Sequence, residues 1–212
     1  FPGELVTVSL ARSIAAVDAT TLRAGGYTLQ YLTAAGPASL QLTTIDTVPV
    51  RTTGATTRLY GGNFVDLDRD QWIDYVAVNE VSADLRVLLN RADGSGLLRP
   101  VLRPVTPIGQ EASPNVAADF NGDGLLDMAT SNTSSSSVSI VLGNGNGSFQ
   151  PQQQVAVGSS PHGLVLVDVD GDADFDLVSA SEGGNDLRIL TNNNLGVFAV
   201  TSTFNSGGDG EY

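Results

Sequence analysis

Short runs of apolar and alternating residues recur along the chain, and they are typical of β-strands. Three early segments alternate between apolar and polar side chains, the period of a strand with one buried face: Glu4–Leu10, Tyr27–Thr33 and Ser39–Ile45. Three later runs are almost continuously apolar: Leu85–Leu89, Val138–Leu142 and Leu187–Leu190. The pattern predicts an all-β protein built from short strands.

The later runs are in register with three acidic loops, at residues 66–74, 119–127 and 168–176, which begin 53 and 49 residues apart. Counted from the last aspartate of each loop, the tenth residue (Asp84, Ser137 or Asp186) opens an apolar run, and the sixteenth is Asn90, Gly143 or Asn192. A Gly-x-apolar turn follows in every copy: Gly96–Leu98, Gly147–Phe149 and Gly196–Phe198. Agreement at this period indicates a repeat protein.

The middle loop has the chemistry of a calcium site. Oxygen-bearing side chains occupy its positions one, three, five and nine: Asp119, Asn121, Asp123 and Asp127. Calcium takes six to eight oxygen ligands at roughly 2.3–2.6 Å, and the carbonyl of Leu125 at position seven adds another. Because Asn115–Ala118 and Met128–Thr130 are predicted strands on either side, the metal would lie in a β-hairpin.

The other two loops place aspartates at the same positions. The first has Asp66, Asp68, Asp70 and Asp74, with the carbonyl of Trp72 at position seven. The third has Asp168, Asp170, Asp172 and Asp176, with the carbonyl of Asp174. The sequence therefore predicts two to three calcium ions.

The loops differ at positions four and six, where a left-handed backbone favours glycine. The middle loop has glycine at both, the third has Ala173 at position six, and the first has Arg69 and Gln71. We expect the middle loop to be the best site and the first the weakest. In the first loop Arg69 either weakens calcium binding or partly replaces the ion, and a solvated acidic turn without metal is also open.

The charge balance excludes two classes of partner. The 212 residues contain 23 acidic and 10 basic side chains, a formal net charge of −13, and twelve of the acids lie in the three loops. Without a basic stripe, nucleic-acid binding has little support, and an anionic membrane would repel the chain. No run reaches the roughly 20 apolar residues of a membrane span. Since there is no cysteine, burial and metal must provide the stability.

The beginning of the chain differs from the repeats. Residues 1–36 contain no acidic loop, and their strands resemble the last strands of a bacterial immunoglobulin-like module. The small residues and proline of Ala34–Pro37 mark a boundary. We predict the end of an immunoglobulin-like β-sandwich at 1–36 and the repeats at 37–212.

Residues 37–212 resemble the FG-GAP or VCBS repeat family, whose calcium-loop blades also form the propeller of integrin α subunits. The resemblance rests on the three loops and on the Gly-x-Phe turns at Phe149 and Phe198. It implies four-stranded antiparallel blades arranged radially, usually about seven of them, with calcium between the first two strands. Three blades are then part of a larger propeller, and we expect further blades from the same longer chain or from neighbouring copies.

The resemblance favours a non-enzymatic, extracellular, calcium-binding module for protein or glycan binding and adhesion. Two alternatives stay open: an accessory or partial propeller domain of a larger secreted enzyme, and a structural spacer in a multidomain surface protein. We expect no enzyme, because the chain lacks G-x-S-x-G and H-E-x-x-H motifs and its lone histidine, His162, is interpreted as a turn residue. Modest-affinity calcium loops fill outside cells, so we expect a secreted or cell-surface protein, of bacterial origin.

Overall fold

The computed structural model describes residues 57–207, the strands Leu5–Leu10 and Tyr27–Leu32, and Thr44, Thr47, Val48 and Val50. Side chains are described for the same residues except 102–104 and the two N-terminal strands. Within this part every regular element is a β-strand, which confirms the predicted fold class. The expected boundary at Ala34–Pro37 lies outside the described residues, as does the strand predicted at Ser39–Ile45 apart from Thr44.

The chain forms two compact units, Phe1–Ile45 with Asp168–Asp174, and Asp46–Val167 with Phe175–Tyr212. In the first unit, β1 (Leu5–Leu10) pairs antiparallel with β2 (Tyr27–Leu32), from Leu5 opposite Leu32 to Leu10 opposite Tyr27. Both strands were predicted from their alternating pattern. Two paired strands are common to many β folds, so the immunoglobulin-like resemblance stays a prediction.

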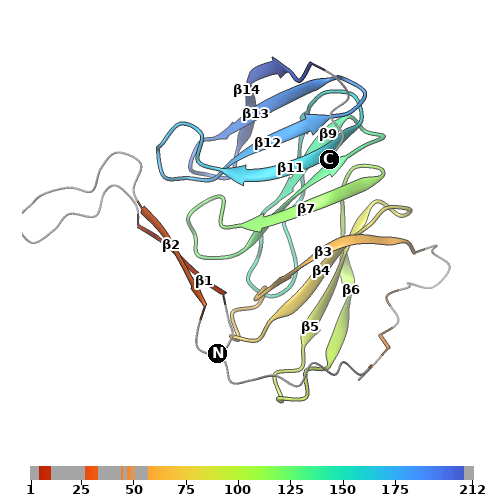
Figure 1. The fold of residues 1–212 in the computed structure, drawn as a ribbon. Helices are drawn as coiled ribbons and strands as arrows, with labels where there is room; N and C mark the ends of the chain where they lie inside the picture. The colour runs from red at the N-terminus through yellow and green to blue at the C-terminus, as the bar shows by residue number, and fades with distance from the viewer. Residues whose placement is uncertain are drawn as a thin grey trace, which may run out of the picture. The chain divides into compact units, whose positions relative to one another are not determined.

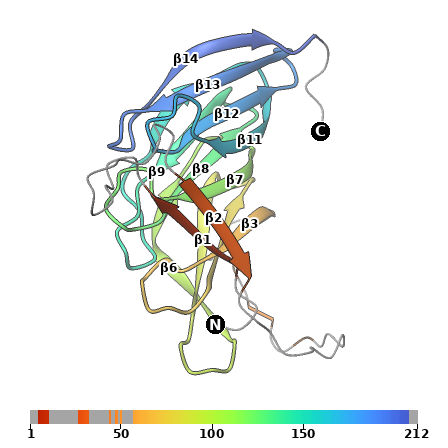
Figure 2. The ribbon, with the colours of Figure 1, turned by 60° about the vertical axis from the view of Figure 1, so that its left-hand side comes forward.

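The second unit contains three four-stranded antiparallel sheets, one for each repeat, as the family resemblance implied (Figures 1 and 2). Blade 1 consists of β3 (Leu59–Val65), β4 (Asp74–Asn79), β5 (Asp84–Asn90) and β6 (Leu98–Pro107). Blade 2 consists of β7 (Ala112–Ala118), β8 (Asp127–Asn132), β9 (Ser137–Val141) and β10 (Gln153–Ala156). Blade 3 consists of β11 (Pro161–Val167), β12 (Asp176–Ser181), β13 (Asp186–Asn192) and β14 (Phe198–Asn205). Nowhere in the described part does a helix have the length and apolar character of a membrane span.

The first strands of the three blades lie next to one another, with β7 between β3 and β11 (Figure 1). Side-chain hydrogen bonds join the blades directly. The amide nitrogen of Asn63 in β3 donates to the carbonyl of Asn115 in β7 at 3.2 Å. The hydroxyl of Thr133, after β8, donates to the carbonyl of Pro161 in β11 at 3.2 Å. Blade 2 is therefore fixed to both neighbours at the first strand.

The apolar core lies between consecutive blades. One buried cluster joins blades 1 and 2, and includes Leu67, Val76, Met128 and Phe149. A second joins blades 2 and 3, where the ring of Phe120 meets that of Phe198 edge-on, with centroids 5.1 Å apart. Leu67 and Phe120 occupy position two of their acidic loops, and Phe149 and Phe198 belong to the Gly-x-Phe turns. The repeat motifs thus supply the contacts that hold each blade to the next.

A pair of buried polar residues stands at the start of the third strand in blades 1 and 2. In blade 1, Asp84 and Arg86 form an ion pair with Nε and Oδ1 2.7 Å apart, and both residues are 6% exposed. In blade 2 the same positions are Ser137 and Ser139, whose hydroxyls accept from the Asn132 amide at 3.1 and 2.8 Å. The scaffold therefore accommodates either an ion pair or two hydroxyls at this place.

We predict that Arg86→Ser destabilises the chain by about 3–5 kcal/mol, because it leaves the Asp84 carboxylate buried without its cation. The double variant Asp84→Ser/Arg86→Ser recovers most of that loss, since blade 2 is built with serines at both positions. Urea unfolding of the variants measures the difference. As a control, Arg188→Ser costs less, because the side chain of Arg188 is 28% exposed in its pair with Asp186. A double variant as unstable as Arg86→Ser would contradict the prediction.

Candidate functional site

Each acidic loop connects the first and second strands of its blade, where the family resemblance placed calcium. The residue before position one pairs with the aspartate at position nine: Val65 with Asp74, Ala118 with Asp127, and Val167 with Asp176. The position-nine aspartate thus begins the second strand. The loops are closed by the strand ladder and have the same length in all three blades.

The backbone is left-handed at positions four and six of every loop, whatever residue stands there. The φ angles are 72° and 79° at Gly122 and Gly124, 64° and 70° at Arg69 and Gln71, and 79° and 73° at Gly171 and Ala173. Non-glycine residues in this region cost roughly 1–2 kcal/mol each. The first loop therefore keeps the backbone path of the middle loop without its glycines, at a cost in strain.

Carboxylates inside each loop accept hydrogen bonds from the loop's own backbone. Position-one carboxylates accept from the position-six N–H, at 3.0 Å from Gln71 to Asp66, 2.8 Å from Gly124 to Asp119 and 3.3 Å from Ala173 to Asp168. Position-five carboxylates accept from the position-seven N–H, at 2.8 Å from Trp72 to Asp70, 2.7 Å from Leu125 to Asp123 and 3.1 Å from Asp174 to Asp172. These bonds hold the backbone at positions six and seven, and the position-seven carbonyls are the expected ligands.

The position-nine aspartates have a structural role that the sequence reasoning missed. Asp127 is fully buried, and its two oxygens accept from the backbone N–H of Phe120 at 2.8 Å and of Gly143 at 2.7 Å. Asp74 accepts in the same way from Leu67 and Asn90, both at 2.8 Å. Asp176 accepts from Asn192 at 2.9 Å. The signal was present in the sequence, because Asn90, Gly143 and Asn192 stand at one constant offset from these aspartates.

Burial changes the acidity of several loop carboxylates. Burial, with smaller contributions from Asp123 and Asp119, raises the pKa of Asp127 to about 6, although its two N–H donors work in the opposite direction. Burial also raises the pKa of Asp74, and burial and then the Asp70 charge raise that of Asp68. A divalent cation would offset this cost, because it stabilises the ionised form of every carboxylate around it.

The structure brings carboxylate oxygens together in the first and third loops. One oxygen each of Asp66, Asp68 and Asp74 lie within 4.8 Å of one another, and so do those of Asp168, Asp170 and Asp172. In the first loop, Oδ1 of Asp66 and Oδ1 of Asp68 are buried with no hydrogen-bond partner. Three convergent hard oxygens fit a calcium ion, and Asp66 and Asp68 each also have a buried oxygen that lacks a partner.

The middle loop is arranged differently. The Asn121 amide nitrogen donates to Asp123 Oδ2 at 2.9 Å, so two expected ligands are bonded to each other. Arg69 of the first loop is exposed and has no ion pair within the described part of the chain. The geometry therefore supports calcium binding by the first loop more strongly than its sequence does. The expected ranking of the three loops as calcium sites stays a prediction.

Comparison with known proteins adds the family. The profile of the FG-GAP-like repeat matches residues 66–130 and 119–179, so that one match spans the first and middle loops and the other the middle and third. The chain belongs to the FG-GAP-like repeat family. The two matches share the middle loop, in keeping with the period found in the sequence. In this FG-GAP-like chain each four-stranded sheet is one blade of a β-propeller-like fold.

No curated protein matches this FG-GAP-like chain, but solved structures resemble it in fold. An Agrocybe aegerita lectin, solved for its specific recognition of non-reducing terminal N-acetylglucosamine, is 23% identical, with 69% of this chain and 38% of the lectin covered and a TM-score of 0.47. Virginiamycin B lyase from Staphylococcus aureus is 13% identical, with 76% of this chain and 45% of the lyase covered and a TM-score of 0.48. The chain thus spans less than half the length of either protein.

We predict that Gln71→Gly stabilises the chain by about 0.5–1 kcal/mol. The change removes the strain of a non-glycine residue in the left-handed region, and the greater freedom of glycine in the unfolded state offsets part of this gain. The matched control is Gly124→Ala, at the same position of the middle loop, where an added Cβ meets nothing within 4 Å. That change introduces only backbone strain and costs about 1 kcal/mol. Urea unfolding in chelator measures both. Destabilisation by Gln71→Gly would show that its backbone is not strained.

The raised pKa of Asp127 predicts how the metal-free chain responds to pH. Its ordinary pKa is 3.8 and its folded value about 6, so the stability it contributes is fully present below pH 3.8 and lost as pH rises through about 6. The loss amounts to roughly 3 kcal/mol at about 1.4 kcal/mol per pKa unit. Asp127→Asn does not titrate. In chelator, the unfolding free energy should therefore fall more steeply with pH for the natural chain than for Asp127→Asn, and parallel curves would contradict the assignment.

Proposed function

We propose that the chain is a non-enzymatic extracellular binding module whose acidic loops hold calcium. The observation that carries the proposal is the convergence of Asp66, Asp68 and Asp74, with two buried and unsatisfied oxygens, in a loop that recurs in register in all three blades. The aspartates at positions one, three, five and nine would hold the ion, with Asn121 at position three of the middle loop and the position-seven carbonyls of Trp72, Leu125 and Asp174 completing the sites.

Calcium supplies positive charge and a cross-link within the hairpin. Four carboxylates crowd a nine-residue loop in the first repeat, and burial disfavours the ionised forms of Asp68 and Asp74. The position-nine carboxylate belongs at once to the loop and to the second strand, so a ligated ion couples the loop to the blade. Affinities of order 10⁻⁴–10⁻³ M suit extracellular calcium-binding modules, which supports a secreted or surface location.

An exposed apolar residue on blade 3 supports further blades as partners. Val65 packs against the core between blades 1 and 2, and Ala118 is buried between blades 2 and 3. The equivalent residue Val167 is 37% exposed. We propose that a further blade covers this residue, from the same longer protein or from a second copy.

Calcium is expected to raise the melting temperature, and a chelator to reverse the rise. A site occupied only in the native state adds about 2.7 kcal/mol at a hundredfold excess over Kd. The position-three variants Asp68→Ala, Asn121→Ala and Asp170→Ala, combined in one chain, should abolish the response, because these side chains lack the buried structural role of position nine. Calorimetry in calcium, magnesium and chelator measures it.

The controls separate metal loss from misfolding. The combined variant should melt close to the natural chain in chelator, and magnesium should stabilise less than calcium, since it requires six ligands at roughly 2.0–2.1 Å. Taken singly, Asn121→Ala should remove more of the response than Asp70→Ala if the order expected from the glycines holds. The same melting temperature in chelator and in millimolar calcium would overturn the proposal.

A further inference from the structure

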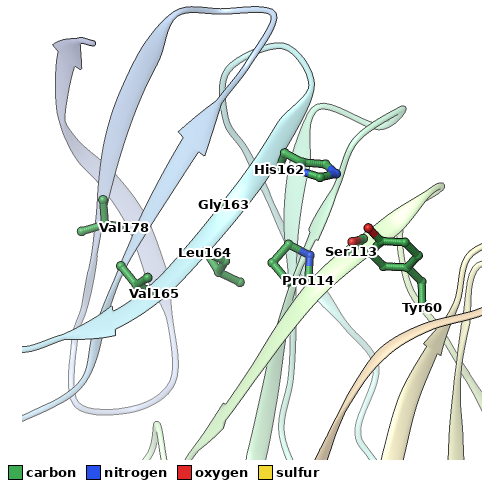
Figure 3. A pocket seen from close by; sticks show the side chains of 8 residues that line it. All are labelled: Tyr60, Ser113, Pro114, His162, Gly163, Leu164, Val165 and Val178. Atoms are coloured by element: carbon green, nitrogen blue, oxygen red, sulfur yellow. The ribbon is translucent and has the colours of Figure 1, made fainter. Parts of the chain in front are cut away.

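A cavity of about 450 Å³ opens where the first strands of the three blades meet, away from the acidic loops (Figure 3). Its polar lining comes from three strands: Tyr60 in β3, Ser113 in β7 and His162 in β11. Its apolar walls include Pro114, Leu164 and Val165. His162, interpreted from the sequence as a turn residue, lies within β11, and that interpretation was wrong. No motif in the sequence pointed to Tyr60 or Ser113.

The three polar residues are equivalent positions of the repeat. Each stands six residues before the position-one aspartate of its loop, Asp66, Asp119 or Asp168. Each also lies at a break in the pairing of its strand, between Tyr60 and Asn63, between Ala112 and Asn115, and between Pro161 and Gly163. A β-bulge re-aims side chains out of the regular alternation. One structural device, repeated three times, therefore presents a phenol, a hydroxyl and an imidazole along one side of the cavity.

These side chains are available to a ligand. Tyr60 is 49% exposed and His162 is exposed, whereas Ser113 is 6% exposed and lies deeper. Within the described part of the chain, none of the three has a hydrogen bond through its side chain. Figure 3 shows His162 projecting from β11 toward the side on which Ser113 and Tyr60 lie, and Leu164 projecting toward Pro114. The polar groups therefore face the open space.

The backbone around the cavity is held in place. The hydroxyl of Thr133 in blade 2 donates to the carbonyl of Pro161 at 3.2 Å, and that of Ser131 to the carbonyl of Gly163 at 3.5 Å. In blade 1 the Tyr75 hydroxyl donates to the carbonyl of Gly61 at 3.5 Å. The residues beside the bulges are thus tied down by side chains from elsewhere in the sheets, and the cavity is preformed.

The chemistry of the lining selects the ligand. Among the described residues, no Asp, Glu, Lys or Arg lines the cavity, although the chain has a net charge of −13. Hydroxyl and imidazole groups can each donate and accept, so they match ligand hydroxyls, which also do both. A half-exposed aromatic ring and a proline supply apolar surface, and the volume falls within the roughly 300–1,000 Å³ of small-molecule sites. A neutral ring with hydroxyls on its edge and C–H groups on its face meets each of these conditions.

We propose that this cavity is a carbohydrate site that takes one neutral saccharide ring, with its C–H face against Tyr60 and its hydroxyls toward Ser113 and His162. The proposal deepens the proposed function, since it gives the binding module a ligand class and a place, but it does not depend on calcium in the loops. The residue at the bulge differs in every blade, so the residues at this position determine which saccharide fits the cavity.

His162 is the only histidine in the chain, so its imidazole proton gives a single resolved NMR signal at the cavity. We expect a titration with neutral monosaccharides (glucose, galactose, mannose and N-acetylglucosamine) to shift this signal saturably for at least one sugar, in chelator as well as in calcium. No shift with any of them up to tens of millimolar would overturn the proposal without any variant. Saturable binding of an apolar peptide or a charged sugar in place of neutral sugars would also overturn it.

Variants then locate the bound sugar, with calorimetry as the readout. Tyr60→Ala should weaken binding at least tenfold and Ser113→Ala several-fold, whereas Tyr60→Phe, which keeps the ring, should cost only a few-fold. The matched control is Phe64→Ala, which removes another exposed aromatic of β3, 70% exposed and outside the cavity lining. Sugar binding unchanged in Tyr60→Ala would place it elsewhere and overturn this proposal but leave the calcium module intact. Sugar binding at the cavity without any calcium response would support this proposal and overturn the calcium module.

Discussion

The buried carboxylate at position nine is the interaction on which each blade depends. Asp127 is withdrawn from water and holds two backbone N–H groups, one in its own loop and one at the end of the third strand. A carboxylate with two such donors remains costly in its ionised form, as its raised pKa shows. The blade is therefore closed by a group whose charge needs a partner, and the acidic loop and the sheet cannot be treated as separate structures.

The same loop also carries the contact to the next blade, through its second residue. The Gly147 N–H donates to the carbonyl of Leu67 at 3.4 Å, and the Asn192 amide nitrogen to that of Phe120 at 2.7 Å. The backbone N–H of Asn192 meanwhile donates to Asp176. Asn192 thus links the position-nine aspartate of blade 3 to the acidic loop of blade 2. Ion binding in a loop is expected to stiffen the boundary between blades as well as the hairpin, because both share these groups.

The sequence predicted what depends on periodicity and chemistry. The alternating pattern, the constant offsets and the spacing of aspartates predicted β-strands, a repeat and oxygen-rich loops in β-hairpins. The resemblance to the FG-GAP family added the four-stranded blades, with the loop between the first and second strands. The sequence did not reveal that the backbone at Arg69 and Gln71 is left-handed. The strand ladder and the Asp66 carboxylate impose that conformation, against the preference of the two residues. The bulges at Ser113 and His162 were missed for a similar reason: a break in pairing is decided jointly with the partner strand, and no pattern along one strand shows it.

The position of the bulge would allow one repeat to serve the two proposed roles, calcium binding and saccharide binding. Ser113 and His162 lie outside the ladder, and Tyr60, which pairs with Val78, borders a break in it. The residue at this position can therefore differ in chemistry from blade to blade. Six residues later the aspartates of the loop are bound to backbone groups at fixed distances, and substitution there disturbs the blade. Stability is thus concentrated at one end of the first strand and variation at the other. A blade can change what it recognises without changing how it folds, since the two requirements fall on different residues of the same strand.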